Sequence, residues 1–447
     1  MNTPICDFVK QYAREKTLRL HMPGHKGAGP LGVEQWDLTE IDGADVLYHA
    51  DGILRESQEN AAALFGSGKT LYSTEGSSLA IRAMVYLLTL YAKQVGRRPL
   101  IAAGRNAHKT FMTAAALLDA EVAWLYPRHE EGLLSCEITA EDLEDALLPM
   151  EERPIAVYLT SPDYLGNMLD IRRISQVCHR YGVLLLVDNA HGAYLRFLPS
   201  SLHPMDLGAD LCCDSAHKTL PVLTGGAYLH ISPSAPPFFW EMGEQAMALF
   251  ASTSPSYLIL QSLDAANAYL AEGYGEKLAN AVERIGEMKA QISMAQVGRE
   301  PLKLTLAPKS YGYLGTELAE LLQEKGIVCE FADPDFVTMM LSPEMTEGDF
   351  ARLQTTLCAV ERKEPILVTP PPIPKALRCM TPKEALFTPS RDLPVGDCLG
   401  KILASACVTC PPAIPVLVCG EQINEDAIAC FEYYGISRCR VLCAKSD

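Results

Sequence analysis

The stretch that decides the fold is Asp214-Ser215-Ala216-His217-Lys218-Thr219-Leu220, which Gly225 and Gly226 follow closely. Thirty positions before Lys218, Asp188 ends the apolar run at residues 183–187. A lysine amine can hold an aldehyde as an imine, and a carboxylate can keep a pyridine nitrogen protonated so that the ring accepts an electron pair. Lys218 and Asp188 together therefore predict a site for pyridoxal 5'-phosphate.

The neighbours of this pair strengthen the prediction. In a parallel α/β sheet, ligands bind beyond the carboxyl ends of the strands, where Asp188 is expected to lie. Ser215 and His217 flank the lysine and are suited to bind a phosphate. Taken alone, Asp188 could cap a turn and Lys218 could be a surface lysine. The combination favours the cofactor.

A second polar turn, at residues 73–80, leads into a helix and contains Gly76, Ser77 and Ser78. Free backbone N–H groups and the positive end of the helix dipole make such a turn an anion site, and the two hydroxyls add donors. By itself the turn is better explained as a plain helix cap, since serine is favoured there.

Short apolar runs alternate with helical patterns along most of the chain, which predicts an α/β fold with a largely parallel sheet covered by helices. We expect a three-part chain: an N-terminal arm (1–50), a large cofactor domain (51–294) and a smaller C-terminal α+β domain (295–447) with a Pro-rich linker near 366–376. Strands are expected at 100–103, 122–126, 155–160, 183–187, 211–213, 227–231, 302–306 and 337–341, and helices at 52–65, 77–92, 141–150, 171–181, 252–274, 276–293, 316–325 and 346–359.

The composition is that of an ordinary globular protein: 447 residues, 48% hydrophobic and 21% charged, with a net charge of -17. The acidic balance argues against nucleic acid or an anionic membrane as a partner and is compatible with a cationic substrate. Neither a signal peptide nor a membrane-spanning run is visible, so a cytoplasmic protein is expected. The 15 cysteines fit reduced thiols better than disulfides, and Cys407 and Cys410 lack a second pair for zinc, so no metal is expected.

Other motifs have stronger plain explanations. Residues 63–70 end like a nucleotide-binding P-loop, but a helical pattern precedes them where a strand is required. His21 and His25 are four apart, but Pro23 and Gly24 disfavour the helix that would align them on a metal. His108, on a loop after an apolar run, could stack on a flat ring or be a bystander.

Several segments in the same order resemble the Orn/Lys/Arg decarboxylase family, of the aspartate-aminotransferase fold (fold type I). The resemblance covers nearly the whole chain. It implies a seven-stranded sheet and a form without the N-terminal wing domain of the large members. The segments are His21–Gly27, Asp37–Gly43, Gly52–Leu54, Arg105–Lys109, Asp188–Gly192, Ser215–Lys218, Ser252–Tyr257 and Met380–Ala385.

The resemblance also assigns roles. It implies that Lys218 binds the cofactor covalently, that Asp188 pairs with the pyridine nitrogen, and that His191 lies near the substrate carboxylate. Family active sites lie at a dimer interface, so a homodimer or a larger homo-oligomer is expected. The remaining cofactor contacts implied are Ala190 and His108 on the two ring faces; Gly76, Ser77, Ser78, Ser215 and His217 around the phosphate; and Thr253 at the phosphate of the neighbouring subunit.

The activity that follows is decarboxylation of a basic L-amino acid to a di- or polyamine and carbon dioxide. An aminotransferase or lyase would use the same Lys218 and Asp188, and a non-catalytic binding protein on this scaffold is a remote alternative. Asp163, Asn189 and Cys410 depart from the family pattern, and Asp163 bears on substrate choice. Neither the preferred amino acid nor the acid that recognises its side chain can be read from the sequence, although Glu384 and Glu421 are candidates.

Overall fold

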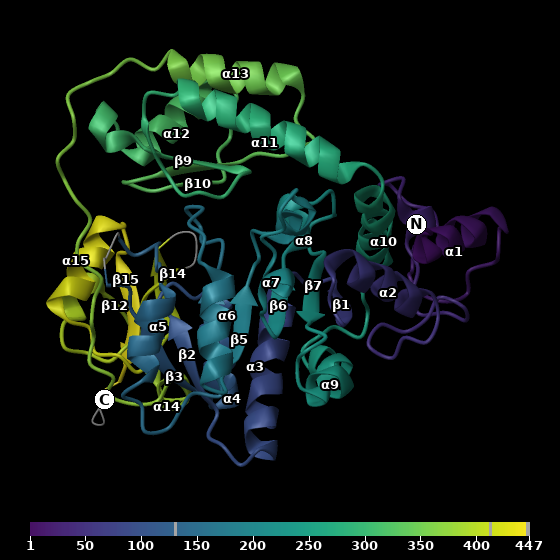
Figure 1. Cartoon of the computed structure of the whole chain (residues 1–447), viewed down its shortest axis with the longest axis horizontal. Coiled ribbons are helices and arrows are strands. Elements are labelled where there is room, and N and C mark those ends of the chain that lie inside the picture. Colours follow the sequence, from purple (N-terminus) through teal and green to yellow (C-terminus); the bar gives the residue numbers. More distant parts are fainter. Residues whose placement is uncertain (129–131, 411–413, 444–447) are drawn as a thin grey trace. The chain divides into compact units, whose positions relative to one another are not determined.

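The computed structural model describes residues 1–128, 132–410 and 414–443 (Figure 1). Its residues group into two compact units. Unit 1 contains Met1–Pro99, Pro154–Leu159 and Ile171–Lys277, and unit 2 contains Leu100–Arg153, Thr160–Asp170 and Leu278–Asp447. The three-part division expected from the sequence stays a prediction.

Seven strands form one sheet in the order β1-β7-β6-β5-β4-β2-β3. β5 and β6 are parallel, as are β2 and β3, whereas β7 is antiparallel to both β1 and β6. The mostly parallel seven-stranded sheet that was expected is therefore confirmed. The strands are β1 (Lys69–Ser73), β2 (Leu100–Gly104), β3 (Glu121–Leu125), β4 (Ala156–Thr160), β5 (Leu184–Asp188), β6 (Leu211–Asp214) and β7 (Ala227–Ile231).

Helices cover the strands of unit 1. α3 packs on β1, β6 and β7, and its outer side receives α9 (Figure 1). Ten of the residues of α3 are buried, among them Leu79, Met84 and Leu88, because its apolar positions recur around most of its circumference. The helices of this unit are α1 (Pro4–Arg14), α2 (Ile53–Phe65), α3 (Ser77–Gln94), α6 (Ile171–Arg180), α7 (Pro204–Leu207), α8 (Ala216–Thr219), α9 (Pro237–Ala248) and α10 (Tyr257–Ala271), with 3-10 turns at Glu34–Trp36 and Ala193–Phe197.

Unit 2 contains a four-stranded antiparallel sheet, β10-β11-β9-β8, and two antiparallel strand pairs, β12 with β15 and β13 with β14. Val416, Leu417 and Phe431 belong to its buried core. The strands are β8 (Ala295–Val297), β9 (Lys303–Ala307), β10 (Phe331–Ala332), β11 (Val337–Met340), β12 (Ser390–Pro394), β13 (Cys407–Cys410), β14 (Ile414–Val418) and β15 (Arg438–Leu442). The helices are α4 (Lys109–Leu118), α5 (Ala140–Leu147), α12 (Gly315–Glu324), α13 (Glu347–Cys358), α14 (Pro382–Leu386) and α15 (Glu425–Tyr433), and α11 (Tyr274–Gln291) begins in unit 1.

The predicted strands all correspond to observed ones within a few residues, but many elements were not predicted, among them β1, α1, α4 and α9 and the short strands and helices after Pro382. β1 follows the glycine-rich turn at residues 66–68, so its sequence reads as a turn, and its strand conformation comes from pairing with β7. The helix expected from residue 252 begins only at Tyr257, because Ser256 caps it with its side chain. Among the helices that the structure describes, none is long and apolar enough to cross a bilayer.

Candidate cofactor site

Three polar segments of unit 1 meet at one edge of the sheet. β5 and β6 are parallel, so Asp188 and the turn Asp214–Lys218 leave the sheet at the same edge. β1 and β6 both run opposite to β7, so the turn after Ser73 emerges at that edge as well, and β7 begins there. The carboxyl ends of the strands thus collect the residues that the sequence singled out.

The turn before α3 is tied directly to the turn after β6. The Ser215 hydroxyl donates to Ser77 Oγ at 2.7 Å, and the Gly76 N–H donates to the Gly225 carbonyl at 2.7 Å. Gly76 has φ +71° and ψ 179°, a conformation essentially restricted to glycine. α3 has 18 residues and starts at Ser77, so its N-terminal dipole adds to the hydroxyls of Ser77 and Ser78. This arrangement can hold a phosphate.

His217 is fastened to the start of β7. Its backbone N–H donates to the Gly226 carbonyl at 3.1 Å, and its Nδ1 donates to the same oxygen at 2.9 Å. Burial lowers the pKa of His217, so the ring is neutral near pH 7 and Nε2 is an acceptor. Donation from Nε2 to a phosphate therefore requires the ring to gain a proton, which a phosphate dianion close by would favour.

Lys218 and His191 lie together in the same unit. Lys218 Nζ is 3.1 Å from His191 Nε2, and His191 is buried whereas Lys218 is half-buried. The two groups can exchange a proton. Ala190, buried directly after the end of β5, presents only a methyl group, which suits contact with a flat ring.

Asp188 is a buried carboxylate that accepts only from neutral donors. It is 2% exposed and accepts hydrogen bonds from the Tyr158 hydroxyl at 3.0 Å, the Ala190 N–H at 3.2 Å and the Cys213 thiol at 3.5 Å. No cation of the described residues forms an ion pair with it. A buried carboxylate without a counter-ion is costly, and a protonated pyridine nitrogen would supply one. The residues at this edge therefore fit pyridoxal phosphate.

A second buried carboxylate, Asp214, lies among His203, His230 and Asn189. Its Oδ2 accepts from His203 Nε2 at 2.9 Å and from His230 Nε2 at 3.2 Å, and its Oδ1 accepts from Asn189 Nδ2 at 2.7 Å. Burial opposes ionisation, but the two imidazoles and their hydrogen bonds outweigh it and hold the pKa of Asp214 well below its ordinary value.

The same three residues, His203, Asp214 and His230, have the composition of a metal site. However, His203 Nδ1 accepts from the Met205 N–H at 3.3 Å. Nε2 of this ring must then carry the hydrogen, and a protonated nitrogen cannot bind a metal. The group is thus a hydrogen-bonded carboxylate that directly precedes the candidate residue Ser215 in sequence.

Two predicted contacts are less fixed in the structure. Thr253 is exposed in the segment before α10, which is attached through the Ser252 N–H donating to Glu75 Oε1 at 2.7 Å. His108 belongs to unit 2, where it caps α4 by accepting from the Thr110 N–H at 3.2 Å. Their contacts with the cofactor stay predictions.

Asp163 has a structural role in unit 2. Its carboxylate accepts from the N–H groups of Leu165 and Asn167, both at 2.9 Å, and from Asn167 Nδ2 at 2.9 Å. Burial raises the pKa of Asp163 to about 6. Its oxygens close the turn at residues 163–167, which makes it a poor candidate for recognising a substrate.

The two acids considered for side-chain recognition also have structural partners. Glu421 is buried, pairs with Arg105 at 3.5 Å and accepts from the Val418 N–H. Glu384 closes the capping box of α14 with Thr381. The P-loop-like segment is likewise explained, because Lys69 pairs with Glu244 at 2.7 Å. Of the paired cysteines considered for zinc, the side chain of Cys410 lies outside the described residues, and the cysteines that are described are free thiols.

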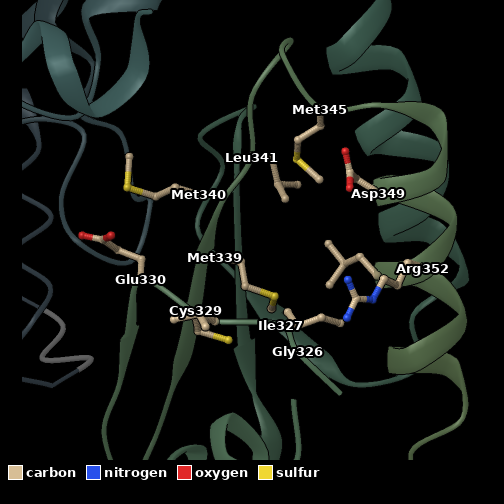
Figure 2. A pocket seen from close by; sticks show the side chains of 12 residues that line it. Gly326, Ile327, Cys329, Glu330, Met339, Met340, Leu341, Met345, Asp349 and Arg352 are labelled. Atoms are coloured by element: carbon tan, nitrogen blue, oxygen red, sulfur yellow. The ribbon is translucent and has the colours of Figure 1, made fainter. Parts of the chain in front are cut away.

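Unit 2 also contains a groove of about 510 Å³ beside α13 (Figure 2). Sulfur-bearing and apolar side chains, including Met339, Met345 and Leu341, line it together with Asp349 and Arg352. None of the predicted cofactor residues contributes to it, so it is not the candidate site.

Sequence reasoning missed three site-related residues: Tyr158, Cys213 and Glu75. Tyr158 and Cys213 lie inside apolar strands, where a hydroxyl or thiol looks like ordinary core. Only the pairing of β5 with β6, which places Cys213 opposite Asp188, brings the thiol to the carboxylate. Glu75 lies within the quoted serine-rich turn, and its link to Ser252 spans 177 positions, which no local pattern signals.

Solved structures with this fold are enzymes of fold type I, the class to which pyridoxal-phosphate enzymes of the aminotransferase type belong. The constitutive lysine decarboxylase of E. coli matches with a TM-score of 0.77 at 18% identity, over 99% of this chain and 82% of that one. The serine palmitoyltransferase of Sphingomonas wittichii matches with a TM-score of 0.55 at 13% identity, over 80% and 83%. At these identities the likeness shows the fold.

The sequence itself goes further. Residues 3–300 match the family described as "Orn/Lys/Arg decarboxylase, major domain". The arginine decarboxylases of Bacillus subtilis and Halalkalibacterium halodurans are each 30% identical to this chain, over 96% of it and 92% of theirs. The chain belongs to the Orn/Lys/Arg decarboxylase family, and it is an amino acid decarboxylase.

Proposed function

We propose that the protein is a pyridoxal-phosphate-dependent decarboxylase that converts arginine, lysine or ornithine into the corresponding amine and carbon dioxide. The observation that carries the proposal is the arrangement of Lys218, the anionic Asp188 and the Ser77–Ser215 pair at one edge of the sheet. The family match and the relatives named arginine decarboxylase support the reaction type.

The chain's own residues have distinct tasks in this reaction. Lys218 Nζ would hold the coenzyme through its amine and would release it to the amine of the substrate. Asp188 keeps the ring nitrogen protonated, and the bound coenzyme then supplies the electron sink for breaking the bond to the carboxylate. Ala190 and His108 are proposed to contact the two faces of the coenzyme ring and so would keep the ring in place.

The phosphate is held by the turn before α3 together with the turn after β6. Gly76, Ser77 and Ser78 contribute backbone and hydroxyl donors, and Ser215 contributes a third hydroxyl. His217 adds a donor once its ring is protonated. Thr253 of a neighbouring copy is proposed to complete this set.

His191 is proposed to guide protons. Its Nε2 lies 3.1 Å from Lys218 Nζ, so it can set the protonation state of that amine before and after the carboxylate leaves. A buried imidazole beside the lysine also suits a contact with the departing carboxylate. Either group can then return a proton to the α-carbon.

The test is a panel of L-amino acids assayed for carbon dioxide release with added pyridoxal phosphate. We expect release from a basic amino acid and a yellow protein whose colour is bleached by borohydride. Lys218→Ala should lose both the colour and the turnover, whereas Lys277→Ala, which removes a lysine that donates to the Tyr269 hydroxyl of α10, should retain them. Amine formation that depends on an added keto acid would instead identify an aminotransferase, and a colourless wild-type protein would refute the proposal.

We also infer that the active enzyme is a homodimer or larger oligomer in the cytoplasm. Leu18, Leu20 and Leu31 in the N-terminal arm are each about four-fifths exposed, which is unusual for such large apolar residues so close in sequence. A second copy packed on this arm would cover them.

A further inference from the structure

We propose that Tyr158 and Cys213 are positioning residues, which fix the Asp188 carboxylate so that a single acceptor position, on Oδ2, is left for the ring nitrogen. The inference rests on the proposed function. It assigns roles to Tyr158 and Cys213 and names Oδ2 of Asp188 as the atom that accepts from the ring nitrogen. Both residues belong to unit 1, as does Asp188.

The first step is a count of acceptor positions. A carboxylate offers about four lone-pair sites, two on each oxygen. On Asp188, Oδ1 accepts from the Ala190 N–H and the Cys213 thiol, and Oδ2 accepts from the Tyr158 hydroxyl. These are the donors that the described residues give to Asp188. Three sites are filled, and the fourth is on Oδ2.

The Tyr158 hydroxyl and the Cys213 thiol can act as donors only while they are protonated. Burial, reinforced by the charge of Asp188, raises the pKa of Tyr158 well above its ordinary value, and the same causes raise the pKa of the Cys213 thiol. Both side chains therefore remain protonated over the whole working range. They can only donate to Asp188 and never compete with it for the proton of the ring nitrogen.

The coenzyme depends on the position and the charge of the Asp188 carboxylate. A buried anion with fixed neutral donors keeps its charge and its orientation without a cation of its own. The charge is then available to the protonated ring. If one donor is lost, the carboxylate can rotate, so the free acceptor position on Oδ2 no longer faces the ring nitrogen.

The alternative is that Tyr158 is an ordinary core tyrosine, and that its hydrogen bond to Asp188 has no effect on coenzyme binding. The chain contains a matched control for this, Tyr228 on β7. Tyr228 is also fully buried in unit 1, but its hydroxyl has no hydrogen-bond partner within the described residues. Tyr158→Phe and Tyr228→Phe remove the same atom from the same kind of surroundings.

The experiment compares these two variants with the wild-type protein for three quantities: the dissociation constant of pyridoxal phosphate, the pH titration of its absorbance when bound, and kcat against KM. Because a hydrogen bond to a charged group stabilises by about 1.5–3 kcal/mol, Tyr158→Phe should weaken coenzyme binding and lower kcat roughly 10- to 100-fold. Its absorbance titration should depart from the wild-type curve, with KM little changed. Tyr228→Phe should stay within about two-fold of wild type on each measure.

Variants of Cys213 provide a second, independent test, which remains valid even if Tyr158→Phe does not fold. Cys213→Ala should weaken coenzyme binding and shift the titration, and Cys213→Ser, which retains a donor of similar size, should restore both. Wild-type coenzyme binding and titration in both Tyr158→Phe and Cys213→Ala would overturn the inference. A wild-type protein that binds no coenzyme would instead refute the proposed function.

Discussion

At the scale of single residues, two buried carboxylates, Asp188 and Asp214, distinguish this edge of the sheet. Asp188 and Asp214 end neighbouring strands, and among the described residues their hydrogen-bond donors are hydroxyl, thiol, amide and imidazole groups rather than lysine or arginine. Asn189, next to Asp188 in sequence, links the two by donating to Asp214. The cofactor residues therefore rest on a second layer of polar contacts.

Asp214→Asn tests that second layer. The amide must turn an N–H toward donors that are already N–H groups, so we expect a loss of roughly 3–5 kcal/mol of unfolding free energy at pH 7. Because the pKa of Asp214 is lowered by folding, its contribution is present above the ordinary value of about 4 and is lost only as the pH falls further. Denaturant unfolding at pH 7 and below pH 4 should show the difference narrowing in acid.

The control for this variant is Asp392→Asn, which removes the charge from an exposed pair with Arg440. Its stability should hardly change, because exposed pairs contribute little. If Asp214→Asn and Asp392→Asn lost equal unfolding free energy, the buried hydrogen bonds of Asp214 would contribute no more to stability than an exposed ion pair.

At the scale of elements, the turn from β1 into α3 depends on one glycine. Gly76 has φ +71° and ψ 179°, and an added Cβ would meet nothing closer than 4.0 Å, so the cost of Gly76→Ala is conformational. We expect about 1–3 kcal/mol lower stability and weaker coenzyme binding. Thermal unfolding and a binding titration would measure both.

Gly286→Ala is the opposite control. This glycine lies inside α11 with open space around it, so alanine should stabilise the helix by about 0.5–1 kcal/mol. If Gly76→Ala also gained stability, the backbone conformation at residue 76 would not require glycine.

Two neighbouring carboxylates before β11 should respond to mutation with opposite signs. Burial raises the pKa of Asp333 to about 6, so its favourable contribution is present below about pH 4 and is lost as the pH rises through 6. Asp333→Asn retains the acceptor for Asp335 and Phe336 and should be more stable than wild type above pH 6. Asp335→Asn weakens a 2.7 Å pair with Lys309 and should be less stable at the same pH.

Melting temperatures at pH 4.5, 6 and 8 would check this pair of variants. The melting temperatures of Asp333→Asn and Asp335→Asn, plotted against pH, should diverge as the pH rises. A pH-independent difference between wild type and Asp333→Asn would contradict the titration of Asp333.

The elements also show how far sequence reasoning reaches. Strands such as β5 and β6 were predictable because their apolar runs end in polar turns, and the Asp188 and Lys218 sites follow from those ends. β1 was not, because the glycines before Lys69 look like a loop until β7 pairs with it. The roles inferred for Tyr158 and Cys213 could not be predicted either, since a buried phenol or thiol acquires its meaning only from the strand beside it.

At the scale of the whole molecule, the exposed leucines of the N-terminal arm predict self-association. Leu20→Glu combined with Leu31→Glu places two charges where we expect a second copy to pack, so the proposed dimer should dissociate into monomers. Sedimentation or light scattering over a concentration series would measure the change. Leu367→Glu, at an even more exposed leucine in the linker of unit 2, should leave the oligomer intact.

The position of β7 has a consequence for how the chain is made. β1 leaves the ribosome first, but β7 separates it from β6, so the earliest strand has no neighbour in the sheet until the latest one inserts. Non-local pairing of this kind is slow to form. Lys69–Ser73 must therefore avoid pairing with other segments while more than 150 residues are synthesised. The edge of the sheet that contains the candidate cofactor site can assemble only after Ile231 has emerged.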